Sequence, residues 1–322
     1  MQPAFKILAN KSDITTKIAD RLLVLELHDE IGTNADTLTL RLDNRQPCIA
    51  LPETGVLLDV FLGYRETGLN FMGQFKVDNL ELSSPPQTLV IRARAAYFKE
   101  SFKSSKTRSF DNITLQTLAT TIANEHGYEL ALSPQLAQHT FEHLDQTHES
   151  DLHLLTRLSR DLGLAIKPVA GKLLIKPRGE NLSVSGLALP AMTVTQDQIK
   201  SYRLTINDRE RYQQVVARWY DVKSGEDKEV IAGGGKPIYP LRRFFVDEAS
   251  AAKAAQAKLK VLQMGERQLT LDLIGMPNLF AELTLIIQTI QPSLNQNWWL
   301  ISVDHTINTN GYITQVQAKA KN

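Results

Sequence analysis

The chain has 322 residues, 43% of them hydrophobic, and its 36 Lys and Arg nearly balance its 35 Asp and Glu, for a formal net charge of +1. This length and apolar content predict two or three domains with well-filled cores and exclude a disordered chain. The charge balance excludes a general electrostatic attraction to nucleic acid or to an anionic membrane.

The cysteine content and the N-terminal sequence indicate the compartment in which the protein is made. The single cysteine, Cys48, excludes an internal disulfide framework, and we expect it to be an inert thiol in a protein made in a reducing compartment. The N-terminus lacks a basic start followed by a long apolar run, and no stretch of about 20 residues is apolar enough to span a bilayer. We therefore predict neither a signal peptide nor a membrane anchor.

Residues 1–102 are predicted to consist mainly of strands. In "GQFKVDNLEL" apolar residues alternate at Phe75 and Val77 and then at Leu80 and Leu82. In "QTLVIRARAAY" the apolar residues from Leu89 to Ala95 share one face, with two arginines on the other. The turn sequence "SSPPQ" between the two runs makes them neighbouring antiparallel strands.

Residues 103–178 are predicted to form a smaller mixed domain. "DNITLQTLATTIANEHG" carries Leu115, Leu118 and Ile122 at helical spacing and ends with Gly127 at a C-terminal capping position. Two short apolar runs, "LGLAIKP" and "GKLLIKP", flank the turn "VAGK" and predict a hairpin.

A second helix is predicted in "THESDLHLLTRLSRDLG". Its leucines from Leu154 to Leu162 fall within an arc of roughly 100°, which is the apolar face of an amphipathic helix. Ser150 is the expected N-cap, Asp151 suits the positive end of the helix dipole, and Gly163 is placed to end the helix.

The same stretch raises the question of a zinc protease site, because His148, Glu149 and His153 follow the order of a H-E-x-x-H box. Histidines four residues apart point about 40° from one another on a helix, whereas five residues separate them by about 140°, so these two cannot share a metal from one helix. His139 and His143 lie nearby, but no pair has zinc-ligand spacing, and we expect a solvated connector into the helix. We predict no catalytic, metal-binding or cofactor-binding residue.

Residues 179–322 return to the strand pattern, interrupted by one alanine-rich helix near residues 247–264. "AGGGKP" lacks the earlier glycine and the following Ser or Thr of a phosphate-binding loop, so we predict a loop tip. Trp298 and Trp299 open an alternating strand, and we expect one indole in the core and the other at a rim or interface.

Several of these stretches, in this order, resemble the phage late control D family, the central hub of contractile phage tails. The stretches are "VDNLELSSPPQTLVIRARAA", "KTRSFDNITLQTLATTIANEHGYEL", "QTHESDLHLLTRLSRDLGLAIKP", "RRFFVDEASAAKAAQAKLKVL", "LIGMPNLFAELTLII" and "WWLISVDHTINTNGYITQVQAKA". The resemblance extends from about Val77 to the C-terminus. More distantly, the chain is similar to the hub part of type VI secretion spike proteins, in which "HESDLHLLTRLSRDLG" matches a structural helix.

The resemblance implies an α+β, mainly β fold. Two tail-tube-like β-barrel domains, residues 1–102 and residues 179–322 with the inserted helix, would flank the mixed α/β domain of residues 103–178. It further implies a homotrimer with a ring of six barrel-like units, facing a six-fold tail tube on one side and a three-fold spike on the other. The spike needle or lysozyme-like domain of longer relatives is expected on separate chains.

The implied function is that of a structural baseplate hub of a contractile phage tail or tailocin, not an enzyme and without a cofactor. Its expected partners are the spike protein, the tail tube protein and other baseplate proteins, with the tape measure protein as a further candidate and no specific nucleic-acid sequence. The expected location is the tail baseplate of the virion or tailocin, after synthesis and assembly in the bacterial cytoplasm. Two alternatives stay open: the hub of a type VI or extracellular contractile injection system, and a cell-wall hydrolase of the injection apparatus, which only the histidine-acid cluster supports.

Overall fold

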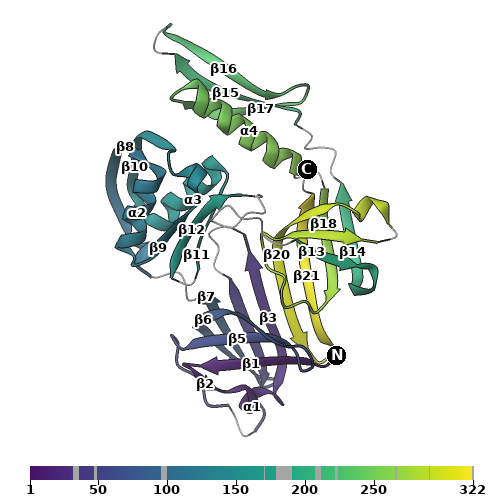
Figure 1. The fold of residues 1–322 in the computed structure, drawn as a ribbon. Coiled ribbons are helices and arrows are strands. Elements are labelled where there is room, and N and C mark those ends of the chain that lie inside the picture. Colours follow the sequence, from purple (N-terminus) through teal and green to yellow (C-terminus); the bar gives the residue numbers. More distant parts are fainter. Residues whose placement is uncertain are drawn as a thin grey trace.

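The computed structural model describes residues 1–31, 36–46, 49–95, 100–169, 171–178, 191–206, 212–221, 224–264, 267–289 and 291–320. Cys48 lies outside these residues. Figure 1 shows four parts, which we call the N-terminal half (residues 1–95), the middle module (100–178), the C-terminal half (191–206 and 267–320) and the helix-capped sheet (212–264). The chain is mainly β, as predicted.

The elements follow in chain order. The N-terminal half contains β1 (Pro3–Ala9), β2 (Ser12–Asp13), α1 (Thr15–Ile18), β3 (Leu22–Glu30), β4 (Thr37–Asp43), β5 (Leu57–Tyr64), β6 (Gly68–Ser83) and β7 (Thr88–Ala95). The middle module contains η1 (Glu100–Lys103), β8 (Ser105–Thr114), α2 (Leu115–Glu125), β9 (Glu129–Leu132), η2 (Pro134–Leu136), β10 (Thr140–Ser150), α3 (Asp151–Leu162), β11 (Leu164–Val169) and β12 (Lys172–Pro177). The C-terminal half contains β13 (Met192–Thr195), η3 (Gln196–Gln198), β14 (Ile199–Ile206), β18 (Arg267–Ile274), β19 (Thr284–Gln288), η4 (Pro292–Leu294), β20 (Asn297–Asn308) and β21 (Gly311–Ala320). The helix-capped sheet contains β15 (Gln214–Asp221), β16 (Glu226–Gly233), β17 (Ile238–Phe245) and α4 (Glu248–Met264).

One sheet runs through both halves. Its main path is β14-β18-β21-β20-β3-β4-β7-β6-β5-β1-β2, and the pairing of β3 with β20 joins the two halves. Ile307 and Tyr312 of the C-terminal half belong to the buried hydrophobic cluster of the N-terminal half. Among the described strands no closed barrel forms, because the halves share a sheet instead of each closing on itself.

The predicted hairpin of the N-terminal half is confirmed. β6 and β7 pair antiparallel, and Phe75 and Val77 are buried as expected. The register shifts between Val77 and Asn79, which brings Leu80 opposite the buried Ile91, in line with the change of phase in the sequence pattern. Leu82 pairs with Leu89 farther along the hairpin and is 54% exposed.

The helices of the middle module are confirmed where the sequence predicts them. The Thr114 hydroxyl accepts a hydrogen bond from the backbone N–H of Thr117 at the start of α2, and Ser150 caps α3 by accepting from the N–H of His153. Gly163 ends α3 with a φ of 66°, the left-handed conformation that glycine adopts without strain. The hairpin of β11 and β12 is also confirmed.

The expected connector before α3 is wrong. Residues 140–150 form strand β10, which pairs antiparallel with β8 in a two-stranded sheet. The inward positions include Leu144 but also the fully buried amide of Gln146, so the apolar alternation that identifies a strand is broken by a polar residue.

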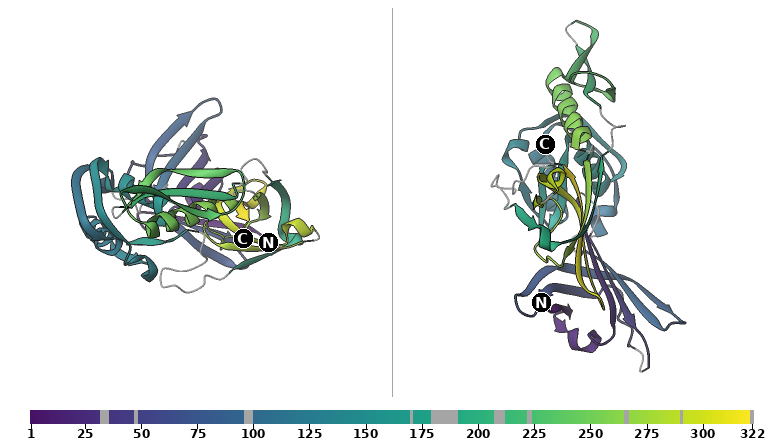
Figure 2. Two further views of the ribbon diagram at one scale, coloured as in Figure 1. Left: turned by 90° about the horizontal axis from the view of Figure 1, so that it is seen from above. Right: turned by 90° about the vertical axis from the view of Figure 1, so that its right-hand side faces the viewer.

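The alanine-rich helix is confirmed as α4, and it covers one face of a separate three-stranded sheet of β15 to β17. "AGGGKP" spans the turn between β16 and β17, the predicted loop. Figures 1 and 2 show this unit projecting from the molecule at the end away from the N-terminus. Among the described residues, no helix combines the length and apolar character needed to cross a membrane.

The prediction for the two tryptophans is wrong in one respect. Trp298 is in the core of the C-terminal half and donates its indole N–H to the carbonyl of Leu294 at 2.9 Å. Trp299 lies on the other face of β20 yet is only 4% exposed, so it does not sit at an open rim.

Candidate functional site

The four histidines of the sequence cluster do not gather around a common point. His143 is an exposed residue of β10, and its ring lies between the carboxylates of Asp111 and Asp145 at 2.5 and 3.1 Å. Hydrogen bonds to these two carboxylates raise the pKa of His143. His148 has a φ of 47° at the point where the register of β10 shifts, so this residue forms a bulge. His153 lies on the exposed face of α3.

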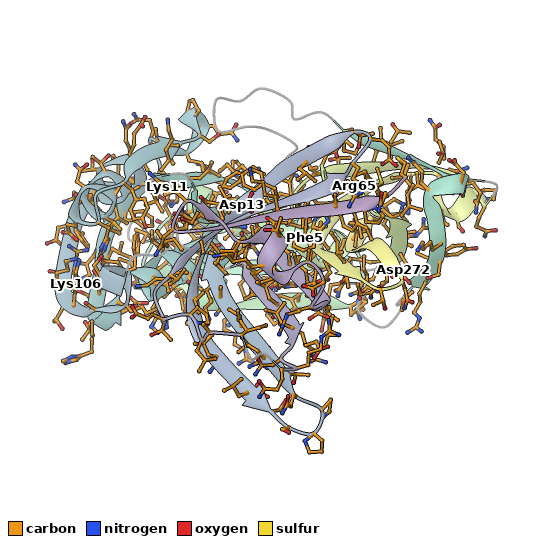
Figure 3. All side chains as sticks on the ribbon, turned by 90° about the horizontal axis from the view of Figure 1, so that it is seen from below. Phe5, Lys11, Asp13, Arg65, Lys106 and Asp272 are labelled. Atoms are coloured by element: carbon orange, nitrogen blue, oxygen red, sulfur yellow. The ribbon has the colours of Figure 1, made fainter. Side chains whose placement is uncertain are left out.

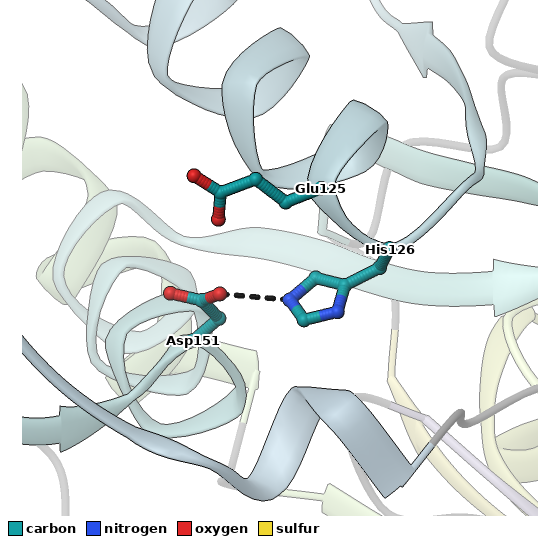
Figure 4. Close-up of side chains that lie close together, drawn as sticks. All are labelled: Glu125, His126 and Asp151. Carbon is teal, nitrogen blue, oxygen red and sulfur yellow. Dashed lines mark hydrogen bonds and ion pairs between the residues drawn. The ribbon is translucent and has the colours of Figure 1, made fainter.

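A different group of three potential ligands is buried in the middle module. Within the described residues, the one set of at least three His, Cys, Asp or Glu ligand atoms within 4.8 Å of one another is Glu125, His126 and Asp151 (Figure 4). Glu125 ends α2, His126 follows it, and Asp151 begins α3. The helix caps therefore bring the three side chains together.

The carboxylate of Asp151 is completely buried and receives four hydrogen bonds. One oxygen accepts from Lys106 Nζ at 2.5 Å and faces His126 Nε2 at 2.7 Å. The other accepts from Arg108 Nη2 and Gln146 Nε2, each at 2.7 Å. We call these residues, together with Glu125, the Asp151 cluster, and it ties together β8, β10, α2 and α3.

Both carboxylates of the cluster are already neutralised by cations. Glu125 accepts from Lys106 Nζ at 2.7 Å and from Arg108 Nη1 at 2.6 Å. Burial alone would raise the pKa of Asp151, but hydrogen bonds from Lys106 and other donors hold that pKa below its ordinary value. A divalent cation would have to displace both basic side chains, so the cluster fits a structural clasp better than a metal centre.

Sequence reasoning found Asp151 only as a residue suited to the helix dipole. Its burial was missed because the partners come from β8, more than 40 residues earlier. The sequence does carry one indication of a buried acid here. Lys106 and Arg108 are two residues apart, so in a strand both cations lie on the same face and require an anionic partner when that face is covered.

A second group of buried charges lies where the middle module meets both halves. Lys167 of β11 donates to Asp29 Oδ1 at 2.8 Å and to Asp36 Oδ1 at 2.7 Å. The other oxygen of Asp29, Oδ2, accepts a hydrogen bond from the backbone N–H of Ala281 at 2.9 Å. Lys176 of β12 pairs with Glu282 at 2.6 Å. We call these six residues the junction.

The pKa values of the charged residues in the junction are shifted in different directions. Burial and the neighbouring Asp29 carboxylate raise the pKa of Asp36 to about 7, although Lys167 acts in the opposite direction. For Asp29, burial is outweighed by Lys167 and by the N–H of Ala281, so its pKa is lowered. The two carboxylates raise the pKa of Lys167 against the effect of burial. Lys167 therefore stays charged throughout the physiological range.

A third polar group joins the halves along the β3–β20 seam. His305 is 1% exposed, and burial lowers its pKa to about 4, so the imidazole is neutral. Its Nε2 faces the carbonyl of Leu279 at 3.1 Å, and its Nδ1 faces the hydroxyl of Tyr312 at 2.9 Å. The Tyr64 hydroxyl donates to the carbonyl of Gly275 at 2.9 Å, and its ring lies 5.7 Å from that of Tyr312. A Cβ at Gly275 would lie 2.2 Å from the Tyr312 ring, so this close approach requires glycine.

Seen from below, the N-terminal half, marked by Phe5 and Asp13, faces the viewer, with Lys106 of the middle module to the left and Asp272 of the C-terminal half to the right (Figure 3). The three polar groups thus bind the middle module internally, dock it on the halves and join the halves to each other. Fully satisfied polar networks of this kind fix the positions of the parts that they connect.

Known proteins are similar to this chain in sequence and in fold. The chain is 29% identical over 364 aligned residues to the probable baseplate hub protein of Escherichia phage 186, with 100% of this chain and 94% of that protein covered. Its fold is similar to that of the 43 kDa tail protein of prophage MuSo2 from Shewanella oneidensis, with a TM-score of 0.71, 15% identity and 98% of each chain covered. It is also similar to a component of the type VI secretion system of E. coli, with a TM-score of 0.59, 12% identity, and 94% of this chain and 74% of that chain covered.

The profile of the phage tail baseplate hub (GPD) family matches residues 78–311, which include the middle module, the helix-capped sheet and six strands of the shared sheet, β7, β13, β14, β18, β19 and β20. The match confirms the resemblance seen in the sequence and assigns a structural role in the baseplate of a phage-type tail. The chain belongs to the phage tail baseplate hub (GPD) family.

Proposed function

We propose that this baseplate hub is a non-enzymatic homotrimer that adapts a six-fold tail tube to a three-fold spike. In this proposal each chain supplies two tube-type units, residues 1–102 and 179–322, and residues 103–178 form the mixed domain between them. Three chains then give a ring of six units, with one rim toward the tube protein and the other toward the spike protein.

The observation that carries the proposal is the open-ended sheet shared by the two halves. Each half has its own buried hydrophobic cluster, which supports treating each as one unit. At one end of the sheet β14 pairs with β18 alone among the described strands, and at the other end β1 pairs with β5 and with the two-residue strand β2. Free strand edges invite pairing with another chain, and a closed ring covers them in a controlled way.

The side chains of β14 support an interface at this edge. Tyr202 is 47% exposed and Ile206 is 60% exposed, although both are large apolar residues. In a three-fold ring the contacts are heterologous, so the C-terminal half of one chain meets the N-terminal half of the next. A permanent interface of this kind buries above about 2,000 Å² in total.

The buried charges support a structural role for the chain. The carboxylates of Asp151 and Asp29 are bound by lysine, arginine or backbone N–H groups at 2.5 to 2.9 Å, and the pKa of each is held below its ordinary value. An acid–base catalyst needs a titratable group free to exchange a proton with a substrate. Groups held in this way act as ties between elements.

The proposal is tested by placing a charge on the free edge of β14. Tyr202→Asp and Ile206→Asp together should abolish trimerisation in sedimentation velocity while leaving the circular dichroism of the chain unchanged. Leu82→Asp is the matched control, because Leu82 is 54% exposed at the far end of the β6–β7 hairpin. A trimer that forms equally well with the β14 variant would overturn this choice of interface.

A further inference from the structure

The middle module is docked on the two halves by polar contacts, and its helix α3 also approaches α4 of the helix-capped sheet. Its buried hydrophobic cluster draws every member from residues 102–175. None of the clusters built from described residues in the two halves or the helix-capped sheet contains a residue of the module. Interfaces between parts of a chain that are polar and lack a shared core allow relative motion of those parts.

The junction supplies the strongest of these contacts. Lys167 projects from β11 to two carboxylates of the N-terminal half, Asp29 at the end of β3 and Asp36 just before β4. The side chains of all three residues are between 15 and 21% exposed. A lysine in such a place is stabilised only while its partners are present, because a buried unpaired charge is costly.

The second contact reaches the C-terminal half. Lys176 of β12 is 7% exposed at its side chain and pairs with Glu282, which precedes β19. Glu282 has a φ of 74°, an unfavourable conformation for a residue with a side chain. Because the N–H of the adjacent Ala281 binds Asp29, this turn connects both lysine contacts.

We propose that Lys167 and Lys176 form a polar latch that docks the middle module on both halves, and that opening the latch lets the module swing as one body. The Asp151 cluster ties the elements of the module to one another, so the module keeps its internal packing when it moves. This inference rests on contacts within one chain and is independent of the proposed trimer.

A spin-label distance measurement tests the latch. Labels at Glu26→Cys on β3 and Thr120→Cys on α2, both exposed positions, report the distance between the N-terminal half and the module once Cys48 is replaced by serine. The otherwise unaltered chain should give one narrow distance distribution. The double substitution of Lys167→Met and Lys176→Met should broaden or shift it, with the hydrogen-exchange protection of α2 unchanged.

Lys172→Met is the matched control. Lys172 pairs with Glu129 at 3.2 Å on the surface of the same module, with 51 and 70% of the two side chains exposed, so the distribution should stay narrow. An unchanged distribution in the folded double variant would overturn the latch. If the double variant does not fold, Glu282→Gln alone must broaden the distribution, and a narrow distribution there contradicts the proposal equally.

Discussion

At the scale of single residues, the molecule concentrates its most constrained chemistry in buried carboxylates. Asp151 receives four hydrogen bonds and contacts both Lys106 and Arg108. Without the Asp151 carboxylate, Lys106 and Arg108 would each lose one of the two carboxylates that they bind in the module. A buried acid of this kind contributes to stability mainly through the cost of breaking its pairs.

Asp151→Asn should destabilise the chain by about 2–4 kcal/mol, because the amide keeps the shape of the carboxylate but not its charge. Urea unfolding monitored by circular dichroism measures the change. Asp145→Asn is the control, since the Asp145 side chain is 63% exposed and its loss should cost no more than about 0.5 kcal/mol. Equal stability of the two variants would show that the cluster contributes nothing to the fold.

Asp36 should make the junction sensitive to pH. Its pKa is about 7 in the folded chain, above the ordinary value of 3.8, so the folded state holds a proton between these values that the unfolded state has lost. The associated stability is therefore present below about pH 4 and is lost as pH rises through about 7. The titratable neighbours of Asp36 are Asp29 and Lys167, and His305 lies near Asp29 as a neutral imidazole. None of these three groups changes charge between pH 5 and pH 8.

The chain should thus lose on the order of 2 kcal/mol of stability from this group between pH 5 and pH 8, and Asp36→Asn should remove that loss. Unfolding free energies of both proteins at the two pH values give the comparison. Parallel pH profiles for the two proteins would contradict the assigned role of Asp36.

At the scale of elements, α3 shows which features the sequence carries. Leucines at helical spacing, a serine cap and a terminal glycine predict its position, and all are local signals. Strand β10 was missed because Gln146 takes an inward position, which Arg108 and Asp151 satisfy from other elements. The bulge of β6, by contrast, shows in the sequence, because the apolar alternation itself changes phase between Val77 and Leu80.

Leu158→Asp should prevent the middle module from folding. Leu158 is 2% exposed within the hydrophobic cluster of the module, so the change loses apolar packing and buries a charge, at a cost of at least about 4 kcal/mol. Hydrogen exchange of the α2 and α3 amides is the direct measurement. Native protection of these amides in the variant would mean that this face of α3 is not buried.

The exposed histidines should behave in the opposite way. Replacing His148 and His153 together with alanine should change stability by no more than about 1 kcal/mol, because both side chains are exposed. Urea unfolding and elemental analysis of the two purified proteins check this. Stoichiometric zinc in the parent chain that is lost from the double variant would restore the metal-site hypothesis.

At the scale of the whole molecule, the sequence could predict the family and the mainly β class but not how the halves connect. His28 and Asp304 pair across the β3–β20 seam although 276 residues separate them along the chain. Such pairing depends on the chain's overall path, which neither periodicity nor turn chemistry encodes. The junction is non-local in the same sense, since its residues come from three separate parts of the chain.

The continuous sheet also explains why the halves should move together while the middle module does not. Tyr312 and Ile307 extend one hydrophobic core across the seam, whereas the module meets the halves at Lys167 and Lys176. A ring of three chains would then have a stiff wall of strands with three hinged bodies attached to it.

The measurement that tests the central claim most directly is the mass of the assembled hub. Light scattering on the purified chain at micromolar concentration, alone and with its separately expressed spike protein, reports the number of chains in each particle. The ring predicts three copies of this chain in the complex with the spike. A chain that stays monomeric with the spike present, and that occupies no three-fold position in images of the assembled particle, would contradict the account.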